Sequence, residues 1–211
     1  MRSSEQNGVS LLEMVITISI AMILMGISFM ALRPMINESH VDSSYSTALT
    51  VLRNTRNLAI TQSHEYYVTF NPPAPYPAGT ILVQYQPPPP TPGGIAPPLE
   101  EVNTYTIETD VQFAVQAGFP ANAPDGFGAG LVAIDFESVP PGVPLACQCV
   151  VFFPDGSSQD PNGNYNSGVV YITRPGDTLF NSRAITVFGA TGRIRGWRLT
   201  QPGGVWTWTQ Q

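Results

Sequence analysis

The N-terminal part of the chain carries one long apolar run, and this run predicts a membrane-spanning helix. Residues 14–32 contain no charged side chain, and their number approaches the roughly 20 residues that a spanning helix needs. Extended back to residue 9, the run includes one charged group, Glu13, and measures about 36 Å as a helix. It exceeds the roughly 7–15 apolar residues of a secretory signal peptide, and no A-x-A-like site follows it. We therefore expect residues 9–33 to remain in the mature protein.

A second pattern begins after this run and predicts an amphipathic continuation of the helix over residues 34–63. Apolar or small residues recur there at steps of three and four, which is the spacing of one helix face. The residues of this face are Val41, Tyr45, Ala48, Leu52, Thr55 and Ala59. The charged residues expected on the opposite side are Glu38, Asp42, Arg53 and Arg56.

From residue 64 onward the pattern changes to short apolar runs bounded by Gly and Pro, which predicts an antiparallel β-domain over residues 64–211. The expected strands are 65–71, 79–86, 102–115, 130–136, 148–153, 168–173, 183–188, 193–200 and 205–209. Eleven prolines lie within residues 71–98, so we expect this insert to be an extended hairpin, partly polyproline II, outside the centre of a sheet. One long helix followed by many strands indicates an α+β fold.

Composition argues against several function classes. Charged residues make up 11% of the chain, lysine is absent, and the net charge of -6 gives no global attraction to nucleic acid or anionic lipid. The sequence contains no P-loop, nucleophile elbow, zinc-binding pattern or paired carboxylates. We therefore expect no enzymatic activity, no cofactor and no metal. For Cys147 and Cys149, a strained disulfide is one alternative, and two half-buried thiols in a strand are the simpler expectation.

Two smaller features are interpreted as structural. Residues 160–166 place oxygen-bearing side chains at alternate positions, as a calcium loop does, but Tyr165 stands where such a loop has glycine. We expect a polar turn there. His40 and His64 lie apart from any sequence cluster of acids or cysteines, so we expect surface or packing histidines and no catalytic role.

The segment Gly8-Val9-Ser10-Leu11-Leu12-Glu13 resembles the prepilin processing motif of type IV pilins and type II secretion pseudopilins. A short polar leader, residues 1–8, ends in glycine, and glutamate occupies the fifth position after it. The resemblance implies that prepilin peptidase cleaves after Gly8 and that the new α-amine of Val9 is methylated. Val9 replaces the phenylalanine that is usual at this position.

Glu13 has a physical role in this interpretation. A carboxylate within an apolar span costs at least about 2.5 kcal/mol on insertion scales. The resemblance implies that Glu13 meets the free amine of a neighbouring subunit, so that two costly charges neutralise each other in a medium of low dielectric. The subunit at the tip of a pseudopilus usually lacks this glutamate, so we expect this chain to lie elsewhere in the filament.

Three later segments are similar to those of GspH/FimT-type minor pseudopilins. They are residues 56–60 near the helix end, residues 151–158 with the sequence VFFPDGSS, and residues 184–195, a strand that leads into Gly192-Arg193. This resemblance implies a type IV pilin-like fold, with the long helix packed on an antiparallel β-sheet domain. It also implies a single-pass protein of the bacterial inner membrane with a periplasmic C-terminal domain. Its function would be that of a minor pseudopilin of a type II secretion system, assembled with other pilins or pseudopilins near the filament tip.

Two alternatives remain open. FimT-type minor pilins of DNA-uptake pili carry a similar Gly-Arg-x-Arg segment, so Arg193, Arg195 and Arg198 are candidate DNA-binding residues. Arg193 and Arg195 would share one strand face and contact successive phosphates. The negative net charge favours the simpler interpretation, in which these arginines are solvated or paired. The second alternative is a secreted enzyme that keeps a membrane anchor. No catalytic motif in the sequence supports this alternative.

Overall fold

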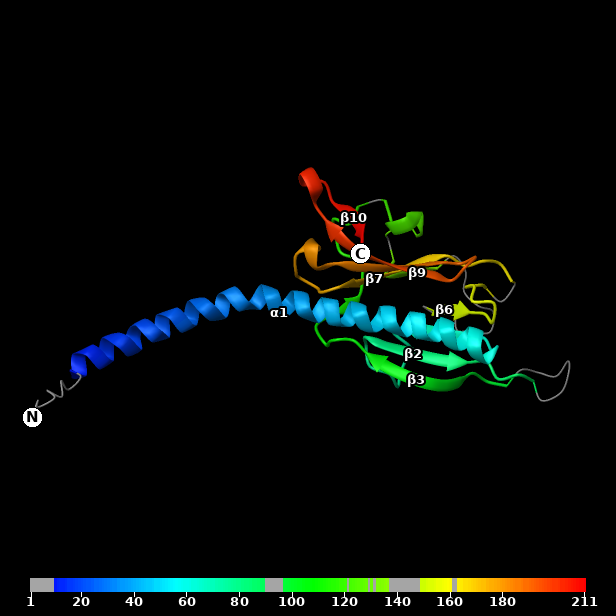
Figure 1. Ribbon diagram of the computed structural model, residues 1–211, viewed down its shortest axis with the longest axis horizontal. Coiled ribbons are helices and arrows are strands. Elements are labelled where there is room, and N and C mark those ends of the chain that lie inside the picture. Colours follow the sequence, from blue (N-terminus) through cyan, green and yellow to red (C-terminus); the bar gives the residue numbers. More distant parts are fainter. Residues whose placement is uncertain are drawn as a thin grey trace, which may run out of the picture. The chain divides into compact units, whose positions relative to one another are not determined.

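The computed structural model describes residues 10–89, 97–120, 122–128, 130, 132–136, 149–160 and 163–211. For residues 29–32 it describes the backbone but not the side chains. Gly8, Val9 and Cys147 lie outside these ranges, so what we expect of them stays a prediction. The chain divides into two compact units, Met1–Glu38 and Ser39–Gln211. Figure 1 shows the elements in chain order.

The first unit is helical over its described residues. The helix α1 spans Leu11–Gln62 and continues into the second unit. Every large apolar side chain from Leu11 to Ile27 is at least half exposed in the isolated chain. The hydroxyls of Thr17, Ser19 and Ser28 donate hydrogen bonds to carbonyl oxygens three or four residues earlier. This stretch is long and apolar enough to cross a membrane, and its hydroxyls are satisfied within the helix, as burial in lipid requires.

The second unit contains the remainder of α1, and its buried face is the predicted one. Val41, Ala48, Leu52, Thr55 and Ala59 are all buried, and Tyr45 packs half-buried beside them. The helix ends at Gln62 and is followed by Ser63 in the left-handed region at φ 57°. A left-handed residue directly after the last turn is a common way for a helix to stop.

Two antiparallel sheets follow, where the sequence led us to expect one sheet domain. The first sheet has the order β3-β2-β1-β6. Its strands are β1 Tyr66–Phe70, β2 Thr80–Tyr85, β3 Glu100–Thr106 and β6 Cys149–Phe152. The expectation that residues 71–98 stay out of the centre of a sheet is wrong for β2, which pairs with β1 on one side and β3 on the other. The prolines of this insert lie on either side of β2 and not within it. They therefore leave the backbone hydrogen bonds of β2 to its neighbouring strands intact.

The second sheet has the order β10-β9-β8-β7-β4, and β5 pairs with β7 off this path. Its strands are β4 Gln112–Phe113, β5 Ile134–Phe136, β7 Gly168–Thr173, β8 Arg183–Phe188, β9 Arg193–Thr200 and β10 Thr207–Gln210. The predicted bounds of β7, β8 and β9 are confirmed. The single strand expected over 102–115 is wrong, since β3 and β4 belong to different sheets and turn residues separate them.

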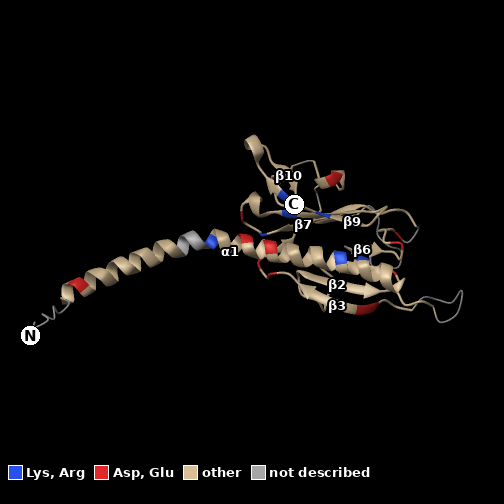
Figure 2. Cartoon of the chain, in the orientation of Figure 1, with Lys and Arg blue, Asp and Glu red and all other residues tan. Residues whose placement is uncertain are grey.

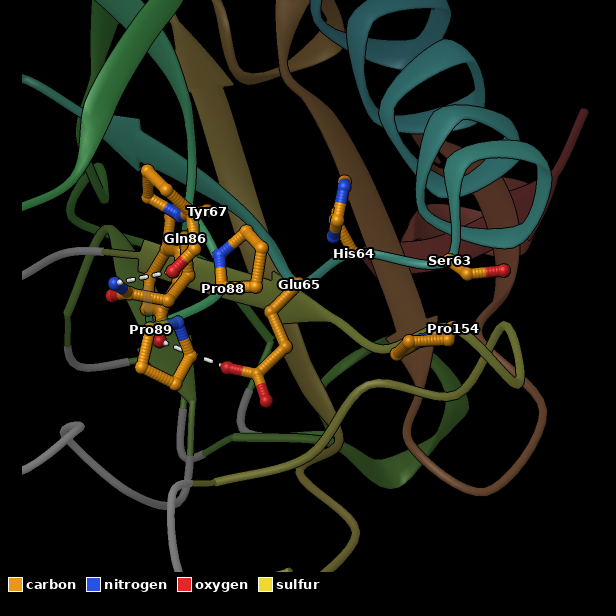
Figure 3. Close-up of a pocket in the computed structure, with 9 residues that line it drawn as sticks. Ser63, His64, Glu65, Tyr67, Gln86, Pro88, Pro89 and Pro154 are labelled. Carbon is orange, nitrogen blue, oxygen red and sulfur yellow. Dashed lines mark hydrogen bonds between the residues drawn. The ribbon is translucent and has the colours of Figure 1, made fainter. Parts of the chain in front are cut away.

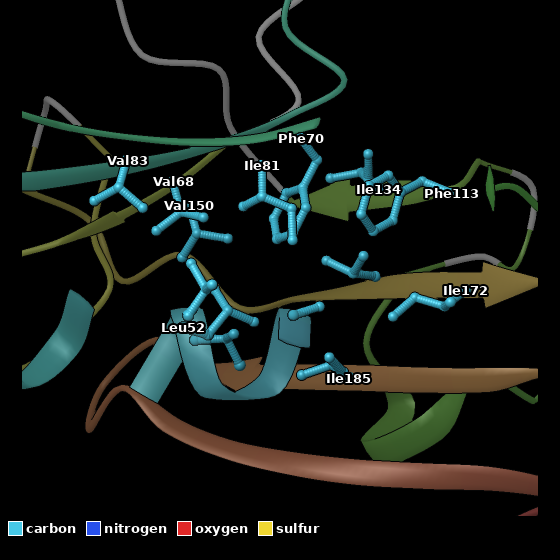
Figure 4. Packing of buried hydrophobic residues seen from close by; sticks show 14 of the residues in the cluster. Leu52, Val68, Phe70, Ile81, Val83, Phe113, Ile134, Val150, Ile172 and Ile185 are labelled. Carbon is cyan, nitrogen blue, oxygen red and sulfur yellow. The ribbon is translucent and has the colours of Figure 1, made fainter. Parts of the chain in front are cut away.

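One hydrophobic core joins the helix and both sheets (Figure 4). Leu52 of α1 belongs to the same buried cluster as Val150 of the first sheet and Ile185 of the second. Phe70 and Phe113, one from each sheet, meet edge to face with ring centroids 5.1 Å apart. The α+β prediction is therefore confirmed, with two sheets sharing one helix.

The expectation of two half-buried thiols is wrong for Cys149. This residue is buried at the start of β6 and is disulfide-bonded. A disulfide is stable in an oxidising compartment.

Candidate functional site

Three segments that are far apart in the sequence meet around the side chain of Arg56. The Nε of Arg56 donates a hydrogen bond to the carbonyl oxygen of Gly156 at 2.9 Å, and its Nη2 donates one to the carbonyl oxygen of Thr191 at 2.9 Å. One long, charged side chain of α1 thus forms hydrogen bonds with both the turn after β6 and the turn before β9. We call this arrangement the Arg56 junction.

Glycines allow the two turns to approach each other at the Arg56 junction. Gly156 and Gly192 have φ angles of 81° and 58°, in the region that side chains rarely adopt. A β-carbon on Gly192 would lie 2.0 Å from the carbonyl oxygen of Gly156, and one on Gly156 would lie 2.8 Å from Cδ1 of Ile60. Glycine is therefore required at both positions for this packing.

The turn that carries Gly156 is fixed from its other side by Asp155. The Asp155 carboxylate accepts hydrogen bonds from the hydroxyl and the backbone N–H of Ser157. These bonds hold the pKa of Asp155 below its usual value despite partial burial. The Asp-Gly-Ser sequence of the turn is thus explained by a carboxylate that accepts two bonds and a glycine with positive φ.

A basic pocket of about 430 Å³ opens beside the Arg56 junction. It is lined by Arg53, Arg56, Asn57, Thr191, Gly192, Arg193 and Ile194. Among the described residues, three guanidinium groups and no carboxylate line this small space. Figure 2 shows where basic and acidic residues lie along α1 and the strands.

The three arginines singled out in β9 do not gather at one place. Arg195 forms an ion pair with Asp125, Nη1 to Oδ1 at 2.9 Å. The guanidinium of Arg193 lies over the Phe188 ring, 5.5 Å from its centroid, and lines the basic pocket. Arg198 is an odd number of residues from both, so it lies on the opposite face of the strand. The sequence predicted only that Arg53 and Arg56 lie on the exposed side of the helix. It did not predict that they line the same pocket as Arg193.

A partly buried ion pair joins α1 to the second sheet. The side chain of Arg183 on β8 is fully buried, and its Nε and Nη2 lie 2.8 and 2.7 Å from Oδ1 of Asp42. Nη1 of Arg183 also donates to the carbonyl oxygens of Phe180 and Ser182. A buried charge needs both a counter-charge and hydrogen bonds, so Asp42 has a structural partner on the side of α1 that we expected to be solvated.

His40 has an acidic partner that lies far from it in the sequence. Its Nδ1 lies 3.0 Å from Oδ2 of Asp110, and Nε of Arg174 lies 2.8 Å from the same oxygen. Partial burial raises the pKa of Asp110, but the hydrogen bonds from His40 and Arg174 outweigh it and hold that pKa below its ordinary value. The pairing joins residues 70 positions apart, which local sequence patterns do not reveal.

Residues 3–29 match the family model of the prokaryotic N-terminal methylation motif. This is a type IV pilin-like protein. No curated protein and no solved structure matches the chain. The motif implies processing by prepilin peptidase and assembly with other pilins, and the apolar part of α1 fits a membrane-anchored, single-pass pilin. The pilin-like family that this motif indicates is a family of structural proteins.

In this pilin-like protein Glu13 lies in the first turn of α1, where a negative charge interacts favourably with the helix dipole. It stands among exposed apolar side chains, including Leu12 and Met14. Gly8 and Val9, the residues of the expected cleavage and methylation, lie outside the described residues.

Asp160 and a proline-lined pocket are two further features of the pilin-like domain. Asp160 accepts hydrogen bonds from the backbone N–H and the amide of Asn164, and no cluster of three or more metal-ligating side chains occurs among the described residues.

A further pocket of about 430 Å³ is walled by Pro87, Pro88 and Pro89 and faces Glu65 (Figure 3). Burial, together with Glu65, raises the pKa of Tyr67 in this pocket to about 12.

Proposed function

We propose that this pilin-like protein is a minor pseudopilin of a type II secretion system, a structural subunit of the periplasmic pseudopilus near its tip. The observation that carries the proposal is the Arg56 junction. The three segments that resemble GspH/FimT-type pseudopilins are brought together by the hydrogen bonds of Arg56, which span 100 and 135 positions of sequence. Three unrelated local likenesses would have no reason to meet at one side chain.

The proposed assembly uses residues 9–33 as the part of the helix that enters the membrane and the filament core. Cleavage after Gly8 exposes the amine of Val9, which then meets the Glu13 carboxylate of a neighbouring subunit. Both charges are costly in an apolar medium, so pairing them favours assembly and fixes the axial register. The β-domain, residues 64–211, lies in the periplasm and supplies lateral contacts.

Substitution of Glu13 tests this proposal. We expect Glu13→Leu to be processed and inserted normally but to be depleted about tenfold or more from sheared filaments, because the amine loses its counter-charge. Thr17→Leu is the matched control, since it places the same side chain one helix turn later without removing a charge. Filament incorporation of Glu13→Leu equal to that of the control would contradict the proposed role.

The host machine is tested by deleting the gene. A type II secretion subunit predicts that exported proteins accumulate in the periplasm while DNA uptake stays normal. Loss of DNA uptake with normal secretion would instead favour the alternative of a FimT-like minor pilin.

DNA binding through Arg193, Arg195 and Arg198 has less support than the secretion role. Arg195 already neutralises Asp125, and the three side chains are divided between two faces of β9. A DNA-binding pilin predicts salt-dependent binding that an Arg193→Gln/Arg195→Gln variant loses. No binding at low salt would remove this alternative.

A further inference from the structure

The positive charges of the second unit are unevenly matched. Arg174, Arg183 and Arg195 each form an ion pair with an aspartate. Arg53 and Arg193 have no ion pair in the part of the chain that the structure describes, and neither has Arg56. These three arginines all line the basic pocket. Among these six arginines, the guanidinium groups without an ion pair to a described residue therefore all lie at one pocket.

The basic pocket is also organised in advance of any ligand. Two backbone carbonyls hold the Arg56 guanidinium in place, and the Phe188 ring supports that of Arg193. Asn57 adds an amide, which can donate hydrogen bonds. Guanidinium groups bind carboxylates and phosphates with matched pairs of donors, and groups already held in place lose little conformational freedom on binding.

The charge of the surrounding unit helps to decide which anion fits. Residues 39–211 contain seven arginines and twelve acidic residues, a net charge of -5. A nucleic acid duplex carries a phosphate charge about every 1.7 Å along its axis, so most of its length would face a negative protein. A short acidic peptide segment needs only the pocket itself.

We propose that the basic pocket binds the carboxylates of an acidic segment on a neighbouring filament subunit. This inference rests on the proposed function, because assembly in a filament supplies the neighbour. Arg56 holds the junction together, while Arg53 and Arg193 contact the incoming carboxylates. The pocket thereby gives the pilin-like domain a lateral contact that is separate from the Glu13 contact of its helix.

Photo-cross-linking of the full-length chain in cells tests this inference. A photo-reactive residue at Asn57 is expected to cross-link to an acidic segment of another pilin or pseudopilin, identified by mass spectrometry of sheared filaments. An Arg53→Gln/Arg193→Gln variant should lower the yield about tenfold or more, as expected when charge-assisted hydrogen bonds are lost. The Arg53→Lys/Arg193→Lys variant keeps the charge and should retain a larger yield. A photo-reactive residue at the exposed Val205 is the control and should not label that segment.

The same samples separate failure of the inference from failure of the proposed function. If the chain is present in filaments but position 57 labels no subunit, labels nucleic acid, or labels equally well in the glutamine variant, the inference is overturned and the function stands. If the unsubstituted chain is absent from the filament fraction, the proposed function fails and the inference fails with it.

Discussion

Gly192 lies so close to Gly156 that a β-carbon on Gly192 would come within 2.0 Å of the Gly156 carbonyl oxygen. The same carbonyl accepts the hydrogen bond from Nε of Arg56. The Gly156 carbonyl oxygen therefore takes part both in the close approach of the two turns and in the hydrogen bond from Arg56. The stability of the junction should respond to a single added methyl group.

Substitution of Gly192 by alanine should destabilise the β-domain by about 2–5 kcal/mol. Positive φ costs about 1–2 kcal/mol for a residue with a β-carbon, and forcing the turns apart adds about 1–3 kcal/mol. Gly203→Ala is the matched control, since Gly203 has φ 63° but nothing within 4 Å of its added β-carbon. Chemical unfolding of the full chain in detergent, followed by tryptophan fluorescence, measures both. Equal losses would show that the turns do not pack as described.

Arg56 and Arg53 lie on the same helix, but we expect different effects on stability when each is changed to glutamine. Arg56→Gln removes two hydrogen bonds from a charged donor and should cost about 2–3 kcal/mol of unfolding free energy. Arg53 is exposed and bonds no described group, so Arg53→Gln should stay within about 0.5 kcal/mol of the parent. The same unfolding measurement checks this. A loss of stability in Arg53→Gln as large as that in Arg56→Gln would argue against the junction.

Removal of Asp42 should be more harmful than removal of its partner. Asp42→Asn leaves the buried guanidinium of Arg183 without its counter-charge, which we expect to cost about 2–3 kcal/mol because Asp42 is half exposed. Arg183→Met removes the buried charge and replaces it with an apolar chain of similar length, so it should cost less. Thermal unfolding of the two variants gives the order. The reverse order would mean that the pair contributes mainly through Arg183 packing.

Acid should weaken the β-domain through Asp110. Its folded-state pKa lies below the ordinary value of 3.8, so the ionised form is favoured by folding. This contribution is fully present above pH 3.8 and is lost as pH falls through the lower folded pKa. Because Asp110 is partly exposed, we expect about 0.5–1 kcal/mol.

Comparison of unfolding at pH 6 and near pH 3 measures this contribution. The Asp110→Asn variant should lose less stability than the parent over the same interval, since it has no carboxylate to protonate at this position. An identical pH dependence in parent and variant would contradict the role of Asp110.

The sequence predicted what depends on local pattern. The buried face of α1 from Val41 to Ala59 follows from helical spacing, and β7, β8 and β9 follow from short apolar runs between turns. Their partners do not follow from such patterns, because β1 pairs with β6 across a long stretch of chain. This is why two sheets were not separated in advance.

The charged contacts escaped prediction for the same reason. Asp42 and Arg183 are 141 positions apart, and Arg195 and Asp125 are 70 positions apart. Which of nine arginines is neutralised depends on the folded chain, so the basic pocket emerged only from the structure. The motif residues of the Arg56 junction could be recognised in the sequence. Their contacts with one another in the folded chain could not be predicted from it.

The N-terminus of the native protein tests the central claim most directly. Mass spectrometry of the chain isolated from its own cells should find a polypeptide that begins at Val9 with one added methyl group on the α-amine. The leader of residues 1–8 should be absent. A chain that still begins at Met1 in cells with active prepilin peptidase would contradict the account, because the nitrogen of Val9 would then be part of a peptide bond and could not pair with Glu13 as a free amine.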